Sequence, residues 1–219
     1  MIVVRAPGGG NGVSAVGPRS ARHSTPARAK QVTHWWWRTV RRDNTRVPAQ
    51  PGGPCAIVIP VPEAEPAVGA WRECYDPSAG QGMPAHITLL YPFLPEDQLT
   101  PTVVTELARL FAEQPGFDIR LTGCARFPAG VLYLSPDPPR PLRALIAAIT
   151  QRWPETPPYG GVFDEVVPHL TVAVQVKPDI ADQIEHHLRP TLPIHATVQQ
   201  VWLYAPDGSR WAPSTGCRC

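Results

Sequence analysis

From residue 55 onward, short apolar runs alternate with amphipathic stretches. Period-2 or continuous apolar runs, bounded by proline, glycine and polar residues, predict strands at 55–61, 84–93, 117–127, 130–135, 169–176 and 194–204. Apolar residues at helical spacing predict helices at 65–75, 100–114, 141–153 and 177–190. Thr100 followed by Pro101 is typical of a helix start. The pattern therefore reads strand, helix, strand, helix, strand, and then repeats.

This repetition indicates an internal duplication in pattern, though not in residue identity. The two βαβαβ halves span about 55–127 and 130–204. We predict a bilobal α+β domain over residues 51–219, with the halves packed about an approximate twofold axis. After Tyr204 the sequence turns at Pro206–Gly208 and restarts at Trp211, but Pro213 disfavours a strand. We therefore expect a missing or shortened closing strand.

Residues 1–50 differ from the rest in composition and charge. They hold nine basic residues and one acidic residue, a net charge of +8, while the remainder carries −6. The segment is rich in Gly, Ser, Pro and Arg without periodicity, which predicts a disordered basic tail. Trp35–Trp37 lie beside arginines and could stack on bases or lie at a membrane surface. The more ordinary explanations are that the cluster has no function, or that the translation start has been placed too early. Because the body is acidic, strong nonspecific binding to long duplexes is disfavoured.

Bulk composition narrows the class of protein. With 219 residues, 43% hydrophobic and 17% charged, the sequence is typical of a globular protein. It has no apolar run long enough to span a membrane and no signal-peptide core, so we expect a cytoplasmic protein. Five scattered cysteines without CxxC spacing favour neither a disulfide framework nor a zinc site.

Two strands begin with the same tripeptide pattern, HxT. His86 and Thr88 open the strand PAHITLLYPF, and His169 and Thr171 open VPHLTVAV. Residues two apart on a strand share a face, so each strand directs an imidazole and a hydroxyl away from its apolar side. That apolar side carries Ile87, Leu89 and Tyr91 on the first strand, and Leu170, Val172, Val174 and Val176 on the second.

Two facing histidines make an acid–base pair near neutral pH. With unperturbed pKa values of about 6.5, one imidazole can be neutral while the other is protonated. One removes a proton from the nucleophile and the other protonates the leaving oxygen. The threonine hydroxyls can donate to non-bridging phosphate oxygens. This scheme requires no metal and no other cofactor.

The other histidines fit a catalytic role less well than this pair. His23 and His195 also occur in HxT. His23 lies in the tail, and His195 lacks the preceding proline and opens a different strand of its half, so we assign it to a strand edge or to a supporting role. His186 and His187 fit a solvated helix face. A metal hydrolase built on the paired histidines and an acid would lack the usual ligand spacing.

The paired motifs resemble those of the two-histidine (2H) phosphoesterases, which include the 2′-5′ RNA ligases and 2′,3′-cyclic phosphodiesterases. The resemblance covers roughly residues 51–210, through AIVIPVPEAEP, PAHITLLYPFLP, GVLYLSPDPP and VPHLTVAV. It implies a bilobal α+β fold with a central cleft and metal-free catalysis. It also implies that His86 and His169 are catalytic and that Thr88 and Thr171 bind phosphate.

The predicted substrate is a nucleotide or RNA end with a 2′,3′-cyclic or 2′-5′ phosphodiester, and no obligate protein partner is indicated. RNA-ligase-like members often carry arginine where this chain has Val174, which disfavours ligation. Tyr91, Arg126 and Tyr133 are candidates for holding the nucleotide, the tyrosines by stacking and the arginine by charge. The alternative is a noncatalytic nucleotide- or RNA-end-binding module with the same cleft.

Overall fold

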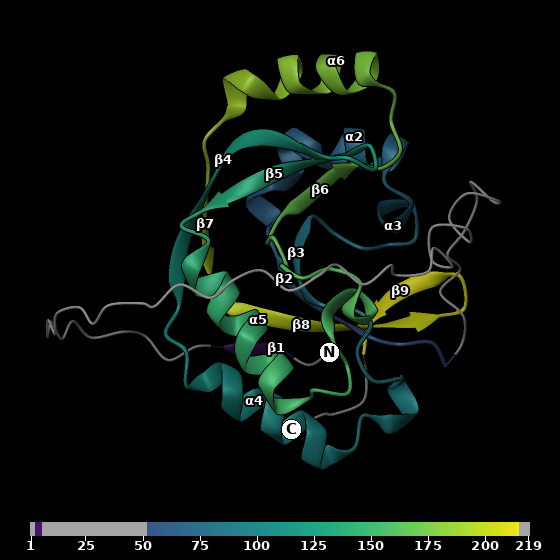
Figure 1. Cartoon of the computed structure of the whole chain (residues 1–219), viewed down its shortest axis with the longest axis vertical. Coiled ribbons are helices and arrows are strands. Elements are labelled where there is room, and N and C mark those ends of the chain that lie inside the picture. The colour runs from purple at the N-terminus through teal and green to yellow at the C-terminus, as the bar shows by residue number, and fades with distance from the viewer. Residues whose placement is uncertain (1–2, 6–51, 215–219) are drawn as a thin grey trace, which may run out of the picture.

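The computed structural model describes residues 3–5 and 52–214. Within these residues, nine antiparallel strands form one sheet in the order β1-β8-β2-β3-β6-β5-β4-β7, with β9 paired to β8 (Figure 1). The strands are β1 (Val3–Arg5), β2 (Ala56–Pro60), β3 (His86–Leu90), β4 (Phe117–Phe127), β5 (Val131–Asp137), β6 (Leu170–Ala173), β7 (Ile194–Val198), β8 (Gln200–Asp207) and β9 (Arg210–Pro213).

The helices lie where apolar spacing predicts them. The main ones are α2 (Glu65–Tyr75), α4 (Pro101–Ala112), α5 (Arg140–Arg152) and α6 (Pro178–Leu188). Thr100 caps α4, its hydroxyl accepting from the Val103 amide at 3.3 Å. Short helical turns that the sequence pattern did not predict are α3 (Pro77–Gly80) and the 3-10 segments Pro62–Ala64, Glu96–Gln98, Pro158–Gly161 and Arg189–Thr191.

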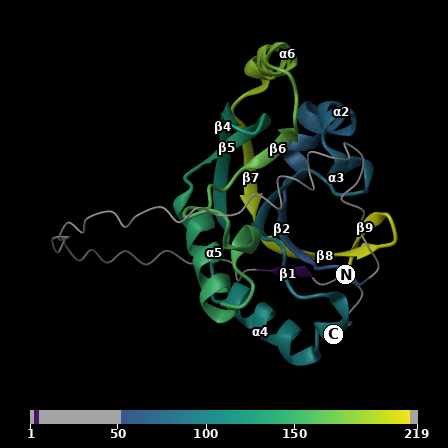
Figure 2. The same ribbon diagram turned by 45° about the vertical axis from the view of Figure 1, so that its right-hand side comes forward.

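The sheet is arranged symmetrically about its two central strands. Exchanging the halves of the chain maps β2 onto β5 and β3 onto β6, so the order β8-β2-β3-β6-β5-β4 reads alike from both ends. The helices follow the same rule: α2 packs on β6 and α6, and α5 packs on β3 and α4. Figures 1 and 2 accordingly show α2 and α6 at one end and α4 and α5 at the other. The predicted α+β fold with duplicated halves is confirmed, and its pseudo-axis passes between the two HxT strands.

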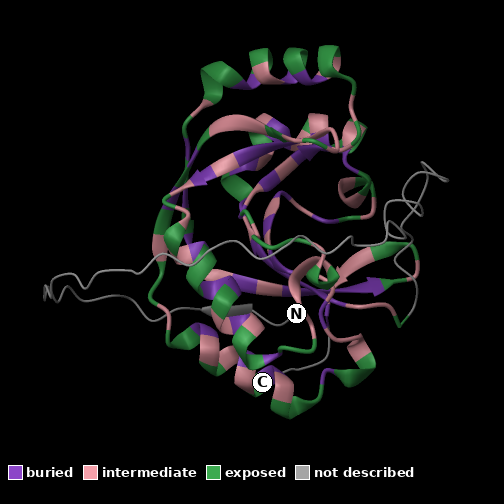
Figure 3. Cartoon of the chain, viewed as in Figure 1, coloured by how far each residue is buried: buried purple, intermediate pink, exposed green. Residues whose placement is uncertain are grey.

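One face of the sheet and the four helices enclose the main core. Each helix contributes buried side chains, for example Val68, Leu107, Leu145 and Ile184. The central strands are buried while the outer helix faces are exposed (Figure 3). A smaller cluster contains Ala56, Val58, Met83 and Tyr204, with Tyr91, Trp202 and Trp211 packed against it.

The prediction of a single strand over 194–204 is wrong. β7 pairs with β4 at one edge of the sheet, whereas β8 pairs with β2 on the other side of the pseudo-axis. The chain thus crosses from one lobe to the other at Gln199, which belongs to neither strand. A short closing strand is present, because β9 pairs with β8 through Pro213, as far as the structure describes this end of the chain.

A β-bulge changes the faces predicted for the first HxT strand. The register between β2 and β3 shifts between Ile57 and Val58. Leu89 and Leu90 are consequently both buried in the main core, whereas Tyr91 packs against the smaller cluster. The prediction that Tyr91 shares the core face is therefore wrong.

The structure describes only part of the terminal segments. Val3–Arg5 pairs with β8 as an edge strand, where we had predicted no element. The rest of the predicted tail, including Trp35–Trp37, lies outside the described residues, as do Cys217 and Cys219. Cys55, Cys74 and Cys124 are free thiols. Among the helices the structure describes, none is long and apolar enough to cross a membrane.

Candidate active site

The two HxT motifs meet at the centre of the sheet. His86 opens β3 and His169 immediately precedes β6. The residues that follow the two histidines, Ile87 and Leu170, form a registered antiparallel pair. Extending this register by one residue in each direction sets each histidine opposite the threonine of the other motif. Because Ile87 and Leu170 point into the main core, all four HxT side chains belong to the opposite face of the sheet.

Sheet geometry sets the spacing within this group of four residues, the HxT quartet. Side chains directly opposite each other have Cβ atoms about 4.5–5.5 Å apart, and diagonal neighbours are about 7–8 Å apart. The two histidines occupy a diagonal of the quartet, and the two threonines occupy the other. This arrangement leaves room for a tetrahedral anion between the imidazoles, with a hydroxyl on each side.

A backbone hydrogen bond fixes the orientation of each imidazole. His86 Nδ1 lies 2.7 Å from the Pro84 carbonyl oxygen, and His169 Nδ1 lies 2.7 Å from that of Val167. Since a carbonyl only accepts, the proton of the neutral ring resides on Nδ1 in both residues. Nε2 is left as a free proton acceptor, and becomes a donor when the ring is protonated. The two motifs therefore share the geometry as well as the tripeptide.

The surroundings disfavour protonation of both rings. Burial lowers the pKa of His86 to about 4, opposed by the hydrogen bond to the Pro84 carbonyl. Positive charge on Arg72 and on His169 lowers it further, while Asp76 acts in the opposite direction. Burial also lowers the pKa of His169, against the hydrogen bond to Val167. Both imidazoles of the free protein are thus harder to protonate than an exposed histidine, and a bound phosphate would favour protonation of one of them.

The threonine hydroxyls of the quartet are available to a ligand. Thr88 and Thr171 are half-buried, and neither hydroxyl bonds another group in the described part of the protein. No fully buried polar side-chain atom among residues 52–214 lacks a partner, so both hydroxyl oxygens are accessible. Most other threonines here bond a backbone or carboxylate group, as Thr105 and Thr150 do.

Aromatic rings surround His169. Tyr133 pairs with Thr171 across β5 and β6 and therefore lies on the HxT face. Its ring centroid lies 5.2 Å from that of His169, and Phe127 approaches the same imidazole edge-on at 4.9 Å. Phe127 and Tyr133 are themselves stacked at 4.2 Å. The structure thus places the predicted Tyr133 beside the site, together with Phe127, which we had not singled out.

A second aromatic group lies on the other side of the quartet. Val58 pairs with Thr88 and with Trp202, so the smaller cluster shares the HxT face. Tyr91 contacts Trp211 edge-on at 5.8 Å within this cluster, and burial raises the pKa of Tyr91. Tyr91 is therefore on the correct face for the role predicted for it, although its ring is packed among other aromatic residues.

Comparison with known proteins identifies the family of this chain. The model of the 2′-5′ RNA ligase superfamily matches residues 60–210, more than half of the chain. The chain belongs to the 2′-5′ RNA ligase superfamily. A Geobacillus kaustophilus (strain HTA426) protein named "putative phosphoesterase" is 29% identical over 123 residues, 53% of this chain and 65% of that protein. The matched region thus spans slightly less than two thirds of that relative.

Two solved structures match this chain at low identity. E. coli LigT complexed with 3′-AMP is 20% identical, with a TM-score of 0.49 and coverage of 74% of this chain and 94% of that one. The protein TT0787 of Thermus thermophilus is 18% identical, with a TM-score of 0.47 and coverage of 73% and 94%. The family-model match over residues 60–210 confirms the predicted resemblance at the level of the family.

Arg126, a predicted nucleotide-binding residue, lies away from the quartet. Ala125 is the residue on β4 that pairs with Tyr133, so Arg126 points to the other face of the sheet. Its guanidinium donates to Asp182 and Glu185 of α6, each at 2.6 Å. The structure therefore does not bring Arg126 together with the quartet, and its Nε and Nη2 are engaged by carboxylates of α6.

The third HxT of the folded region is separated from the quartet. His195 is exposed on the edge strand β7, where it pairs with Arg120. Thr197 donates its hydroxyl to Asp118 at 2.8 Å. His195 and Thr197 are therefore suitable controls for the quartet.

No metal-binding cluster accompanies the quartet in the described residues, and a large hollow of the structure lies elsewhere. Among residues 52–214, no three His, Cys, Asp or Glu side chains are grouped so as to hold a metal ion. A hollow of about 630 Å³ lies between α5 and the segment 157–166, and no quartet residue lines it. Its polar contacts include the exposed ion pair between Arg143 and Glu165. The candidate site is therefore identified by the side chains of the quartet.

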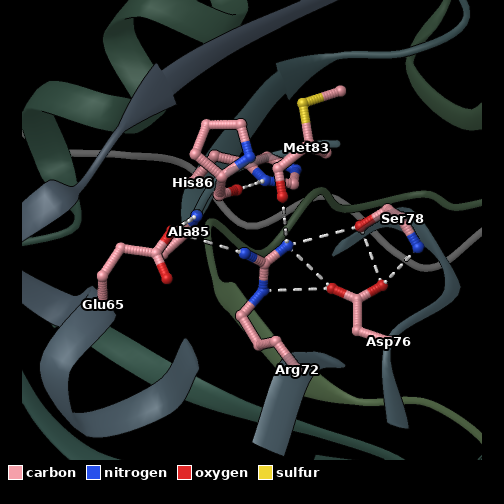
Figure 4. Close-up of polar contacts among 8 residues, drawn as sticks. Glu65, Arg72, Asp76, Ser78, Met83, Ala85 and His86 are labelled. Carbon is pink, nitrogen blue, oxygen red and sulfur yellow. Dashed lines mark hydrogen bonds and ion pairs between the residues drawn. The ribbon is translucent and has the colours of Figure 1, made fainter. Parts of the chain in front are cut away.

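Sequence reasoning missed one charged residue behind His86. Arg72 on α2 is only 2% exposed and is bonded to the buried Asp76 (Figure 4). A signal for it exists in the sequence, because Arg72 follows the buried Val68 by four residues and so lies on the inward face of the helix.

Proposed function

We propose that this protein is a metal-independent phosphodiesterase that acts on 2′,3′-cyclic or 2′-5′ nucleotide phosphodiesters by paired general acid–base catalysis. The observation that carries the proposal is the matched setting of the two imidazoles. His86 and His169 each bond a carbonyl two residues earlier through Nδ1 and have Nε2 free on the same face of the sheet. Membership of the 2′-5′ RNA ligase superfamily supports the same conclusion.

The proposed step transfers two protons and exchanges one P–O bond for another. Nε2 of one histidine takes a proton from water while the water oxygen bonds phosphorus. The bond from phosphorus to the 2′ or 3′ oxygen breaks, and that oxygen receives a proton from Nε2 of the other, protonated histidine. The hydroxyls of Thr88 and Thr171 donate to the non-bridging oxygens, where negative charge accumulates. Exchange with solvent restores the initial protonation of the pair.

The aromatic groups beside the quartet suit a nucleotide. Tyr133, with Phe127 stacked on it, lies next to His169, and Tyr91 lies in the cluster on the other side. Base–aromatic stacking depends little on base identity, so these rings would hold a nucleotide with weak sequence preference. Val174 in place of an arginine favours hydrolysis over RNA ligation.

We expect purified protein to hydrolyse 2′,3′-cyclic nucleotides or cyclic-phosphate-ended RNA at an unchanged rate in EDTA. Chromatography and ³¹P NMR would separate the 2′- and 3′-monophosphate products and so show which bond breaks. A 2′-5′-linked dinucleotide and its 3′-5′ isomer form a matched second pair of substrates. Loss of activity in EDTA would favour a metal hydrolase, and saturable binding without turnover would favour the noncatalytic module.

A further inference from the structure

The segment Met83–Ala85, which carries the hydrogen-bond acceptor for His86, is held by charged side chains of α2. Arg72 donates through Nη2 to the Met83 carbonyl at 3.2 Å, and Glu65 accepts from the Ala85 amide at 2.5 Å (Figure 4). The Pro84 carbonyl, which His86 bonds, lies between these two contacts. The position of this carbonyl, and with it the direction of the His86 ring, therefore depends on α2.

Arg72 is itself fixed in place by a buried ion pair. Its Nε and Nη2 donate to one Asp76 carboxylate oxygen at 3.1 and 2.9 Å, and both side chains are at most 5% exposed. Asp76 uses its other oxygen to accept from the amide and hydroxyl of Ser78, at 3.0 and 2.8 Å. Glu65 lies 3.8 Å from Arg72 Nη1. The hydrogen bonds of this buried pair hold the Arg72 guanidinium in one orientation.

In the described residues, no buried ion pair supports the hydrogen-bond acceptor of His169. The acceptor for His169 is the carbonyl of Val167, which is 36% exposed. The nearest ion pair along that segment, between Arg143 and Glu165, is on the surface. The duplicated halves thus supply the same hydrogen bond to each imidazole, but only His86 has a full positive charge buried behind it.

We propose that Arg72 is a positioning residue for His86: held in place by Asp76, its guanidinium bonds the Met83 carbonyl and so fixes the neighbouring Pro84 carbonyl that His86 bonds, with its positive charge behind the ring. The charged groups around His86 are Arg72 and Glu65 from α2, Asp76 immediately after that helix, and His169 immediately before strand β6. The inference rests on the proposed function only for its consequences in catalysis, because the charge and the hydrogen bonds concern the free protein.

The two members of the ion pair act on His86 in opposite directions, which provides the test. Arg72→Met removes the positive charge and should raise the pKa of His86, whereas Asp76→Asn leaves the arginine uncompensated and should lower it. We expect shifts on the order of one unit. A residue needed only for folding would not move this pKa in opposite directions in the two variants.

The measurement is a histidine NMR titration of the full chain, with the His86 signals assigned by comparison with His86→Asn. It needs no substrate, so it decides the inference even if the protein has no phosphodiesterase activity.

Thermal unfolding would establish that each variant is folded. If Arg72→Met does not fold, Asp76→Asn still tests the charge effect, and Arg72→Lys should retain the pKa because it keeps the charge. Arg126→Met, which removes an exposed arginine bound to two carboxylates, is the matched control and should leave His86 unchanged.

In an active enzyme the same variants should shift one limb of the pH–rate profile. Arg72→Met should move the limb that belongs to His86 to higher pH, and Asp76→Asn should move it to lower pH. A moving acidic limb would make His86 the base, and a moving alkaline limb would make it the acid. Folded variants with the His86 pKa unchanged, or shifted the same way in both, would overturn the proposal.

Discussion

Replacing either His86 or His169 with alanine should lower turnover of a 2′,3′-cyclic nucleotide by about 10²- to 10⁴-fold. Each variant lacks one of the two Nε2 atoms that share the HxT face, so one proton transfer must proceed through water. Because both transfers serve one displacement, the double variant should lose much less than the product of the two single losses. Initial rates at saturating substrate, measured across pH, would check this expectation.

His195→Ala is the matched control for these variants. It removes a histidine from an HxT tripeptide on the same sheet, but from the exposed edge strand β7. Turnover should be unchanged. A comparable loss in all three variants would indicate a general effect on the sheet, and an active His86→Ala or His169→Ala would rule out paired catalysis.

Hydrophobic alternation was sufficient to predict most of the elements. β4 and α2 have the bounds that the pattern predicted, and the repeat of strand and helix order anticipated the symmetric sheet. The HxT pair was recognisable because two polar residues on one face of a buried strand have no structural purpose there. A pattern of this kind is local, and it is reliable where each strand keeps its period of two.

What the pattern missed depends on contacts between distant strands. The bulge opposite Ile57 and Val58 transfers Tyr91 to the HxT face, and nothing within residues 84–93 encodes it. Residues 194–204 alternate up to Val198 and resume out of phase at Val201, and they form two strands because β7 pairs with β4 while β8 pairs with β2. The position of Arg126 also depends on distant contacts. The pairing of β4 with β5 determines which face of the sheet its side chain occupies, and its hydrogen-bond acceptors are on α6.

Replacing Thr88 or Thr171 with valine should reduce kcat by about 10²- to 10³-fold, the usual effect of removing one donor to a developing oxyanion. Valine keeps the β-branched shape that suits a strand, so the sheet should be preserved. KM should change little, because the hydroxyls bind the non-bridging oxygens most strongly when charge builds up in the transition state. Serine, which retains the hydroxyl, should restore most of the rate at either position.

Thr197→Val separates this role from strand structure. Thr197 belongs to the third HxT and already donates its hydroxyl to Asp118, so its loss should leave kcat unaltered. If the valine variants of Thr88 and Thr171 instead raise KM at constant kcat, the hydroxyls hold only the ground-state phosphate. If neither constant changes, the two threonines are ordinary strand residues. Because the threonines occupy the second diagonal of the quartet, comparable losses at both positions would indicate a phosphate held between them, whereas a loss at one position would indicate a phosphate bound to a single motif.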